Sequence, residues 1–242
     1  MIAIFKRELH AYFISPIGYI FVTVFLLVAG AFFTFTNIMA GMGGADASPS
    51  SYFLFIIFSF IVLIPLLTMR LLADERKTKT EQLILTSPVS LTGMVFAKFL
   101  AAFTLFAGTL LVSCFNFYVL YRFAATPGQT NTASLIGHVI GVLLIGSAFI
   151  AIGLFISALT ENQLTAAIIS IVTLLFLLLS GFVSQFVGIR AVRIILDFLS
   201  IFSRFQAFSH GLFDINAIIY YASIVIIFLF LTVRIYEARR WQ

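Results

Sequence analysis

The chain has 242 residues, of which 62% are hydrophobic and only 10% are charged. A soluble domain is nearer half apolar, with about a quarter of its residues charged, so this composition predicts an integral membrane protein. The formal charge of +5 does not indicate nucleic-acid binding, because the basic residues form no dense run. Cytoplasmic loops of membrane proteins gather Lys and Arg, which accounts for the charge.

Residues 1–14 predict a short amphipathic helix that does not cross the membrane. Apolar side chains recur in it at helical spacing, while the basic side chains fall mostly on other sides of the helix. The apolar positions are Ile2, Phe5, Leu9 and Tyr12 or Phe13. We expect this helix to lie in the cytoplasmic interface, with a frayed terminus as the alternative. The Ser15-Pro16 pair that follows is typical of a helix start.

Six apolar runs are long enough to cross about 30 Å of hydrocarbon. The expected spans are residues 17–39, 52–72, 91–121, 134–158, 164–183 and 215–233. A cleaved signal peptide is the alternative for the first run, but that run is too long for one. Pro65 predicts a kink in the second span. In the fourth, Gly137 and Gly141 form a GxxxG pair, which we assign first to packing within the bundle and second to a dimer seam.

Residues 184–214, between the fifth and sixth spans, are too polar to cross a membrane. Their apolar residues at helical spacing are Val192, Ile195, Leu199 and Phe202. Arg193 and Asp197 stand four residues apart on the opposite side, where they could form an ion pair. We expect one or two short helices that lie in the outer interface or dip back into it. An ordinary loop is the alternative.

The distribution of Lys and Arg predicts the orientation of the bundle. With both termini on one side, that side holds Lys6, Arg7, Arg70, Arg76, Lys77, Lys79, Lys98, Arg234, Arg239 and Arg240, and the other side holds Arg122, Arg190, Arg193 and Arg204. The positive-inside rule therefore places both termini in the cytoplasm. Lys98 lies about one turn into the third span, so we expect it to snorkel toward the cytoplasm.

The densest cluster of charge, residues 73–90, separates the second and third spans and is expected to lie in water. Within it, Thr78 and Glu81 have the spacing of a capping box, which favours a helix start. The helix would carry apolar residues 83–85 and end before Pro88. Such a helix either docks in a groove of a partner or caps the bundle on the membrane surface, and the spacing favours neither.

The chain carries few groups that could perform chemistry. The span centres hold no Asp, Glu, Lys or Arg, which ion-coupled carriers usually place there. Cys114 is the only cysteine and His138 lies near the outer end of its span, so both are expected to be packing residues. No phosphate-binding loop occurs, and His10 and His210 have no metal ligands at suitable spacing. We therefore expect no enzyme activity, cofactor or metal in this chain, and ATP would have to bind another polypeptide.

Four passages together resemble the ABC type-2 exporter permeases, most closely those of the gliding-motility and multicopper-maturation type. They are KRELHAYFISPIGYI at 6–20, ERKTKTEQLILTSPVS at 75–90, GLFISALTENQLTAA at 153–167 and RFQAFSHGLFDINAIIYY at 204–221. The passages occur in the family's order, and the resemblance covers nearly the whole chain. One difference is that family members often carry Gly where this chain has Thr78 or Lys79, which we expect to stiffen the helix start.

The resemblance implies an all-α bundle of six transmembrane helices, forming one domain over residues 1–242, in a bacterial inner membrane. A second permease copy or paralogue would complete the pathway, and two cytoplasmic ABC ATPase subunits would supply ATP and Mg²⁺. The residues that would couple the permease to the ATPase are Thr78, Glu81, Gln82, Leu83, Ile84, Leu85, Thr86, Ser87 and Pro88. The interfacial helix would contribute Phe5, Lys6, Arg7 and Glu8. A re-entrant outer gate would contain Phe205, Phe208, Gly211 and Asp214.

The resemblance thus favours an ATP-driven exporter whose membrane subunit forms the translocation path. Two other classes stay open: a membrane scaffold that transports nothing, and a channel or carrier that works alone. The uncharged span centres argue against the carrier. Aromatic, uncharged walls would suit an amphipathic or lipidic cargo, but helix packing alone produces the same composition.

Overall fold

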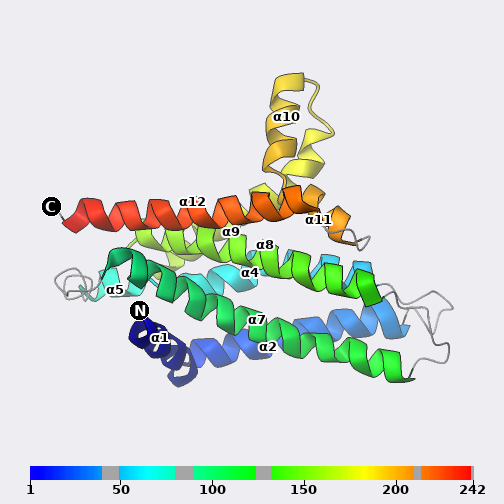
Figure 1. Ribbon diagram of the computed structural model, residues 1–242, viewed down its shortest axis with the longest axis horizontal. Helices are drawn as coiled ribbons and strands as arrows, with labels where there is room; N and C mark the ends of the chain where they lie inside the picture. The colour runs from blue at the N-terminus through cyan, green and yellow to red at the C-terminus, as the bar shows by residue number, and fades with distance from the viewer. Residues whose placement is uncertain (40–48, 80–89, 124–131, 210–213, 241–242) are drawn as a thin grey trace.

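The computed structural model describes residues 1–39, 49–79, 90–123, 132–209 and 214–240, and within these ranges the regular structure is helical. Figure 1 labels the helices. They are α1 Ile2–Ile14, α2 Pro16–Phe33, η1 Thr34–Met39, α4 Pro49–Thr68, α5 Ala73–Lys77, α7 Leu91–Phe123, α8 Thr132–Leu159, α9 Gln163–Ser184, α10 Arg190–Leu199, α11 Ile201–Ser209 and α12 Ile215–Arg240.

Within the described ranges, six helical segments are long and apolar enough to cross a membrane, which confirms the expected all-α membrane bundle. They are Pro16–Met39, Pro49–Lys77, Leu91–Tyr118, Ser134–Leu159, Gln163–Ser184 and Ile215–Arg240. Helices suit this environment because every backbone N–H and C=O inside lipid must find its partner within the protein.

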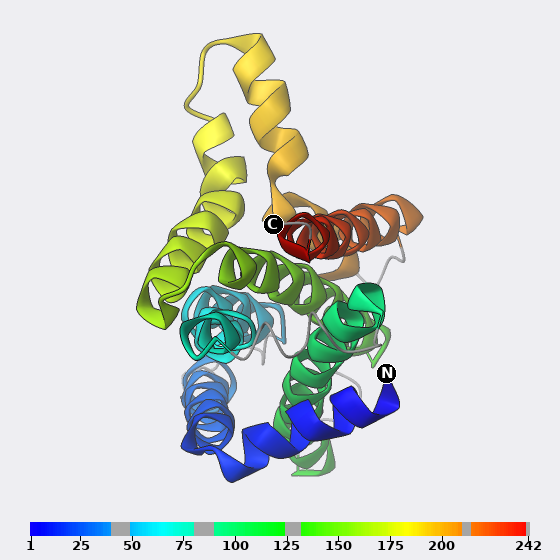
Figure 2. The ribbon, with the colours of Figure 1, turned by 90° about the vertical axis from the view of Figure 1, so that its left-hand side faces the viewer.

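Helices α4 and α8 form the centre of the bundle, and the other long helices surround them (Figure 2). In the most apolar part of α8, 67% of the residues are buried, against 17% in α12 on the periphery. The part of the core that lies between α4, α8, α2 and α7 consists largely of aromatic side chains. The ring of Phe60 stacks on that of Phe25 at 6.0 Å and meets the edge of Phe106 at 5.0 Å.

Glycines of α8 allow neighbouring elements to approach its backbone closely. A methyl group placed on Gly146 would overlap the ring of Phe106, and one on Gly153 would overlap the side chain of Thr68. Gly141 lies against Phe205 of α11, where an added Cβ would come 2.9 Å from the ring. This contact is inside the protomer, so the structure favours packing within the bundle for this half of the GxxxG pair.

Side chains cap the starts of several helices. The Ser15 hydroxyl accepts a hydrogen bond from the Ile17 amide at 3.2 Å, and Pro16 occupies the first position of α2. Asn162 accepts from the Leu164 amide at 3.0 Å, which starts α9 directly after the tight turn from α8. Asp214 accepts from the Asn216 amide at 2.9 Å at the start of α12. Each cap satisfies a backbone donor that the first helical turn leaves free.

Some elements differ from the sequence expectation. Helix α4 ends at Thr68 and an irregular turn separates it from α5, so the second span, which we expected to reach residue 72, is not one continuous helix. Pro65 lies inside α4 and has no backbone N–H to continue the ladder, which weakens the last turn. Helix α2 passes into the π-helical turn η1, where Thr36 donates to the Phe32 carbonyl at 2.7 Å. Helix α12 continues to Arg240, beyond the expected end at residue 233.

The segment between α9 and α12 contains two short helices, as expected. Helix α10 projects sideways from the bundle (Figure 1), and none of its residues is buried. Arg193 and Asp197 on α10 approach to 3.9 Å, which confirms the expected pair, and Asp197 also accepts a hydrogen bond from Ser184 of α9. Helix α11 folds back against α8 and α9.

Candidate functional site

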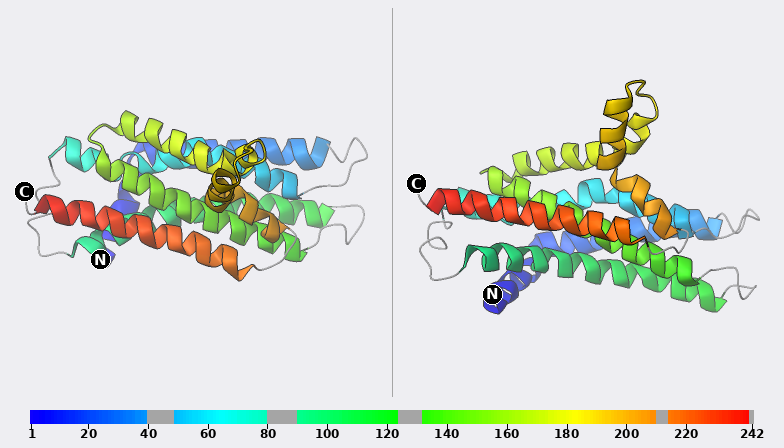
Figure 3. Two further views of the ribbon diagram at one scale, coloured as in Figure 1. Left: turned by 90° about the horizontal axis from the view of Figure 1, so that it is seen from above. Right: turned by 45° about the horizontal axis from the view of Figure 1, so that its top comes forward.

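The two termini, α5 and the first turns of α7 lie at the same end of the bundle (Figure 3). Helix α1 lies across this end, against α7 and α2 (Figure 2). Tyr12 of α1 is buried, and its hydroxyl donates a hydrogen bond of 3.1 Å to the Leu67 carbonyl of α4. Arg70, in the turn after α4, donates to the Ser15 hydroxyl. These contacts fix α1 to the bundle, although Ile2 and Phe13 remain exposed.

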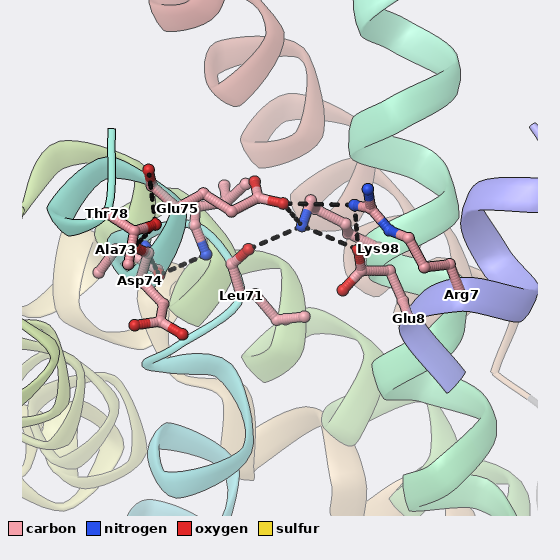
Figure 4. A network of polar contacts seen from close by, with 10 residues as sticks. Arg7, Glu8, Leu71, Ala73, Asp74, Glu75, Thr78 and Lys98 are labelled. Carbon is pink, nitrogen blue, oxygen red and sulfur yellow. Dashed lines mark hydrogen bonds and ion pairs between the residues drawn. The ribbon is translucent and has the colours of Figure 1, made fainter. Parts of the chain in front are cut away.

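Four charged side chains from three helices meet beneath α1 (Figure 4). We name this cluster, consisting of Arg7 and Glu8 of α1, Glu75 of α5 and Lys98 of α7, the polar junction. The Lys98 ammonium lies 2.8 Å from the Glu75 carboxylate and 3.3 Å from that of Glu8. The Arg7 guanidinium lies 2.6 Å from Glu8 and 3.4 Å from Glu75. Two positive and two negative charges therefore balance.

The polar junction is enclosed around Lys98, while the Arg7 side chain on its outer side is 57% exposed. The Lys98 side chain is 1% exposed, and its ammonium also donates 2.9 Å to the Leu71 carbonyl at the end of α4. An ammonium is buried at acceptable cost only when anions and carbonyls replace its hydration, as they do here. The hydrogen bond to Glu8 raises the pKa of Arg7, so this guanidinium keeps its charge. The cluster therefore ties α1, α5 and α7 together through charge pairing.

Two sequence expectations are corrected here. Lys98 does not snorkel to the surface, because two carboxylates and a carbonyl hold its ammonium inside the protein. The charged stretch after α4 does not lie wholly in water either. Asp74 and Glu75 are both half-buried, because each is paired with a residue of another element.

A second set of contacts joins the break between α4 and α5 to the turn between α8 and α9. The Ser157 hydroxyl donates to the Met69 carbonyl at 3.1 Å and accepts from the Leu72 and Ala73 amides at 3.2 and 3.1 Å. On the far side of the turn, Gln163 donates to Asp74 at 2.7 Å. Arg76 lies 2.7 Å from Glu161 and also donates to the Leu159 carbonyl at 3.0 Å.

The expected coupling segment begins where α5 ends. Of its residues only Thr78 is described, and Glu81, Gln82, Leu83, Ile84, Leu85, Thr86, Ser87 and Pro88 lie outside the described residues. The Thr78 hydroxyl donates to the Asp74 carbonyl at 2.8 Å, which closes the last turn of α5. Lys79 follows with a φ of 57°, a left-handed conformation that glycine adopts most easily. Of the two positions, Thr78 and Lys79, at which the resemblance led us to expect Gly, Lys79 is the one with an unusual backbone in this chain.

The other expected site residues are placed as follows. Phe5 is half-buried and Lys6 is exposed, while Arg7 and Glu8 belong to the polar junction. Phe205 and Phe208 are buried, and Phe205 meets the edge of His138, whose ring stacks on Phe53 at 5.1 Å. His138 is thus a packed residue in this structure. Asp214 caps α12, and Gly211 lies outside the described residues.

Sequence reasoning did not identify Lys98, Glu75 or Ser157 as the residues that join these elements. Lys98 carries a visible signal, because it is a charged residue inside an otherwise apolar run, and Glu75 lies in the charged stretch one turn before Thr78. Ser157 carries none, since a serine in an apolar run is also a common packing residue. Among the described residues, no three His, Cys, Asp or Glu side chains are grouped as metal ligands would be.

The chain was compared with known proteins. A family model described as ABC-2 family transporter protein matches residues 36–236. The search of curated proteins finds no match. The matched region includes the break after α4, all of α5, and the elements from α7 to Tyr236 of α12.

Proposed function

The chain belongs to the ABC-2 transporter family, and we propose that it is the permease subunit of an exporter driven by a separate cytoplasmic ATPase. The family match supports a multi-pass membrane protein that forms a transport path. The ATPase, the direction of transport and the second permease copy are parts of the proposal. The single observation that carries it is the position of the polar junction, directly before the segment that would contact the ATPase.

The contacts around α5 suggest how force would pass into the bundle. A push on residues 80–89 would act on α5 through Thr78. From α5, Glu75 leads to Lys98 of α7 and, through it, to α1. Asp74 and Arg76 lead to the turn between α8 and α9. Charge pairs and short hydrogen bonds have a directional geometry, so a displacement of one partner is passed to the other.

The break between α4 and α5 fits the same mechanism. A continuous helix would move the whole of α4 with α5. An irregular turn at 69–72, whose backbone is held by the Ser157 hydroxyl and the Lys98 ammonium, instead lets α5 tilt while α4 keeps its place in the core. We propose that this turn is the hinge of the coupling movement.

The partner is tested by co-purification with the ABC ATPase encoded beside this chain. We expect the wild type to retain the ATPase, and the double variant Leu83→Asp and Leu85→Asp to lose it while still inserting into the membrane. Leu164→Asp is the matched control, because Leu164 is exposed on α9 at the same end of the bundle and lies outside the loop. A double variant that inserts and still retains the ATPase contradicts the coupling role.

Reconstitution in liposomes separates the exporter from the other classes. The complex with its ATPase is expected to hydrolyse ATP faster when cargo is present. Transport by the purified chain without any ATPase would identify a channel or carrier. A complex that assembles but shows neither transport nor cargo-dependent hydrolysis would identify a scaffold.

We further propose that both termini and α5 face the cytoplasm of a bacterial cell. The orientation is measurable by cysteine labelling in a Cys114→Ala background. Lys77→Cys, on α5, should react with a membrane-impermeant reagent only from the cytoplasmic side. Arg190→Cys, at the start of α10, should react only from outside, and both residues are exposed in the structure. The reverse pattern would contradict the orientation.

A second copy of the chain is proposed because α10 leaves the bundle with all of its residues unburied. Its apolar side chains include Ile194, Ile195 and Phe198, which are 59%, 58% and 63% exposed. A cysteine at Ile194 is expected to crosslink to a second copy in membranes. If it reacts only with lipid-soluble reagents and never forms a dimer, α10 lies in lipid and the copies meet elsewhere.

A further inference from the structure

A groove runs between α7 and α12 at the end of the bundle that carries both termini, where the two helices lie beside each other (Figure 3). Its inner part has a volume of about 370 Å³ and is walled by apolar side chains of both helices. They are Val95, Phe96, Leu229, Phe230 and Val233. Its outer part has a volume of about 690 Å³ and includes Ser90, Glu237 and Arg240. Thr92 and Glu237 line both parts, so the two are continuous.

The groove changes from apolar to charged along the helix axes. On α12 the lining residues are 229, 230, 233, 234, 237 and 240, a spacing of three or four between successive turns that puts them on one side of the helix. The apolar residues come first and the charged ones last, toward the end of the chain. This is the polarity of a phospholipid, with an acyl chain deep in the bilayer and a headgroup at its surface.

The charges at the mouth favour an anion. Arg234 lies 2.7 Å from Glu237, so these two charges cancel. The neighbouring Arg239 is directed elsewhere and donates to the Ala158 carbonyl at 2.7 Å. Arg240 is exposed and has no acidic partner in the described part of the chain. Among the described residues, the groove therefore carries one positive charge, on Arg240, that no carboxylate neutralises.

We propose that this groove binds an anionic phospholipid, with one acyl chain between Val95, Phe96 and Phe230 and the phosphate beside Arg240. Basic side chains at the membrane surface between transmembrane helices are suited to acidic headgroups. The hydroxyls of Ser90 and Thr92 border the same mouth and can donate hydrogen bonds to phosphate oxygens. The lipid would join the last turns of α12 to the start of α7, where the chain returns from residues 80–89.

The test uses the purified full chain, stripped of lipid in detergent and titrated with phosphatidylglycerol or phosphatidylcholine, with binding followed by native mass spectrometry and melting temperature. We expect one phosphatidylglycerol to be retained and to raise Tm, and phosphatidylcholine to do so only at higher concentration. Arg240→Gln should weaken phosphatidylglycerol binding about fivefold and remove the preference. Arg240→Lys should restore it, because the charge returns.

Two controls make the outcome decisive. Lys77→Gln removes an exposed charge at the same end but outside the groove, and should leave lipid binding unchanged. Thr92→Trp fills the point where both parts meet, and should weaken binding of both lipids. Equal effects of Lys77→Gln and Arg240→Gln, equal retention of the two lipids, or the same rise in Tm with inorganic phosphate alone would each overturn the proposal.

Discussion

The ammonium of Lys98, on α7, lies 2.8 Å from the carboxylate of Glu75, on α5, and a single enclosed charge pair thus joins the third span to the helix that precedes the coupling segment. Glu8 of α1 lies 3.3 Å from the same ammonium. Breaking a buried pair is costly because the remaining charge loses its partner without regaining water. The junction is therefore expected to respond strongly to single changes and less to paired ones.

Replacing Lys98 with Met tests this directly. Lys98→Met leaves the carboxylates of Glu8 and Glu75 facing each other in a poorly hydrated site, so we expect a loss of about 3 kcal/mol in the free energy of unfolding. The double variant with Glu75→Gln should recover part of that loss, giving a coupling energy of about 1 to 3 kcal/mol. Unfolding in mixed micelles measures both. Lys77→Met, on the exposed side of α5, is the control, and additive effects of Lys98→Met and Glu75→Gln would contradict the pairing.

Ser157 is expected to hold the hinge between α4 and α5. In Ser157→Ala the Leu72 and Ala73 amides lose their acceptor and the Met69 carbonyl loses a donor. Leaving such groups unsatisfied costs about 1 to 3 kcal/mol. Hydrogen exchange should report it locally, with faster exchange at residues 72 and 73.

The matched control for the hinge serine is Ser147→Ala in the same helix. The Ser147 hydroxyl donates to the Leu144 carbonyl of its own helix, and its loss leaves no second element without a partner. Equal exchange rates at residues 72 and 73 in wild type and Ser157→Ala would show that the hydroxyl does not hold the turn.

Gly146 is expected to be required by the ring of Phe106. Gly146→Ala places a methyl group inside the space of that ring, which is fully buried and meets Phe60 at 5.0 Å. Overpacking of this kind costs about 1 to 3 kcal/mol and lowers Tm. Gly108 has nothing near its missing side chain, so Gly108→Ala should be neutral or raise stability by about 1 kcal/mol through helix propensity. If both variants change the melting temperature equally, the close approach of α7 and α8 at Gly146 is contradicted.

The sequence allowed the number of spans to be predicted, because length and apolarity decide whether a helix can cross a membrane. A local signal placed the start of α2, since Ser15 acts on the amide of Ile17, two residues away. Such information is contained in neighbouring residues. It can therefore be obtained from a single sequence.

The polar junction could not be predicted in the same way. The position of Lys98 in its span gives its depth in the membrane, but its partners depend on how α7 is rotated and on where α1 crosses it. Ser157 and Gly141 raise the same difficulty, because a small residue does not show which neighbouring element approaches it. Contacts between distant segments follow from the packing of the whole bundle.

The last prediction concerns Lys79, whose φ of 57° places a side chain where the backbone favours glycine. For an L-residue this conformation costs about 1 to 2 kcal/mol, so Lys79→Gly is expected to stabilise the end of α5 by up to about 1 kcal/mol once the greater freedom of glycine in the unfolded chain is deducted. Lys79→Val should lose about as much, because a β-branched side chain suits this region poorly. Lys79→Ala is the control that removes the charge and keeps a Cβ. If Lys79→Ala and Lys79→Gly give the same melting temperature, the charge and not the backbone decides the effect, and a left-handed residue at the end of α5 is contradicted.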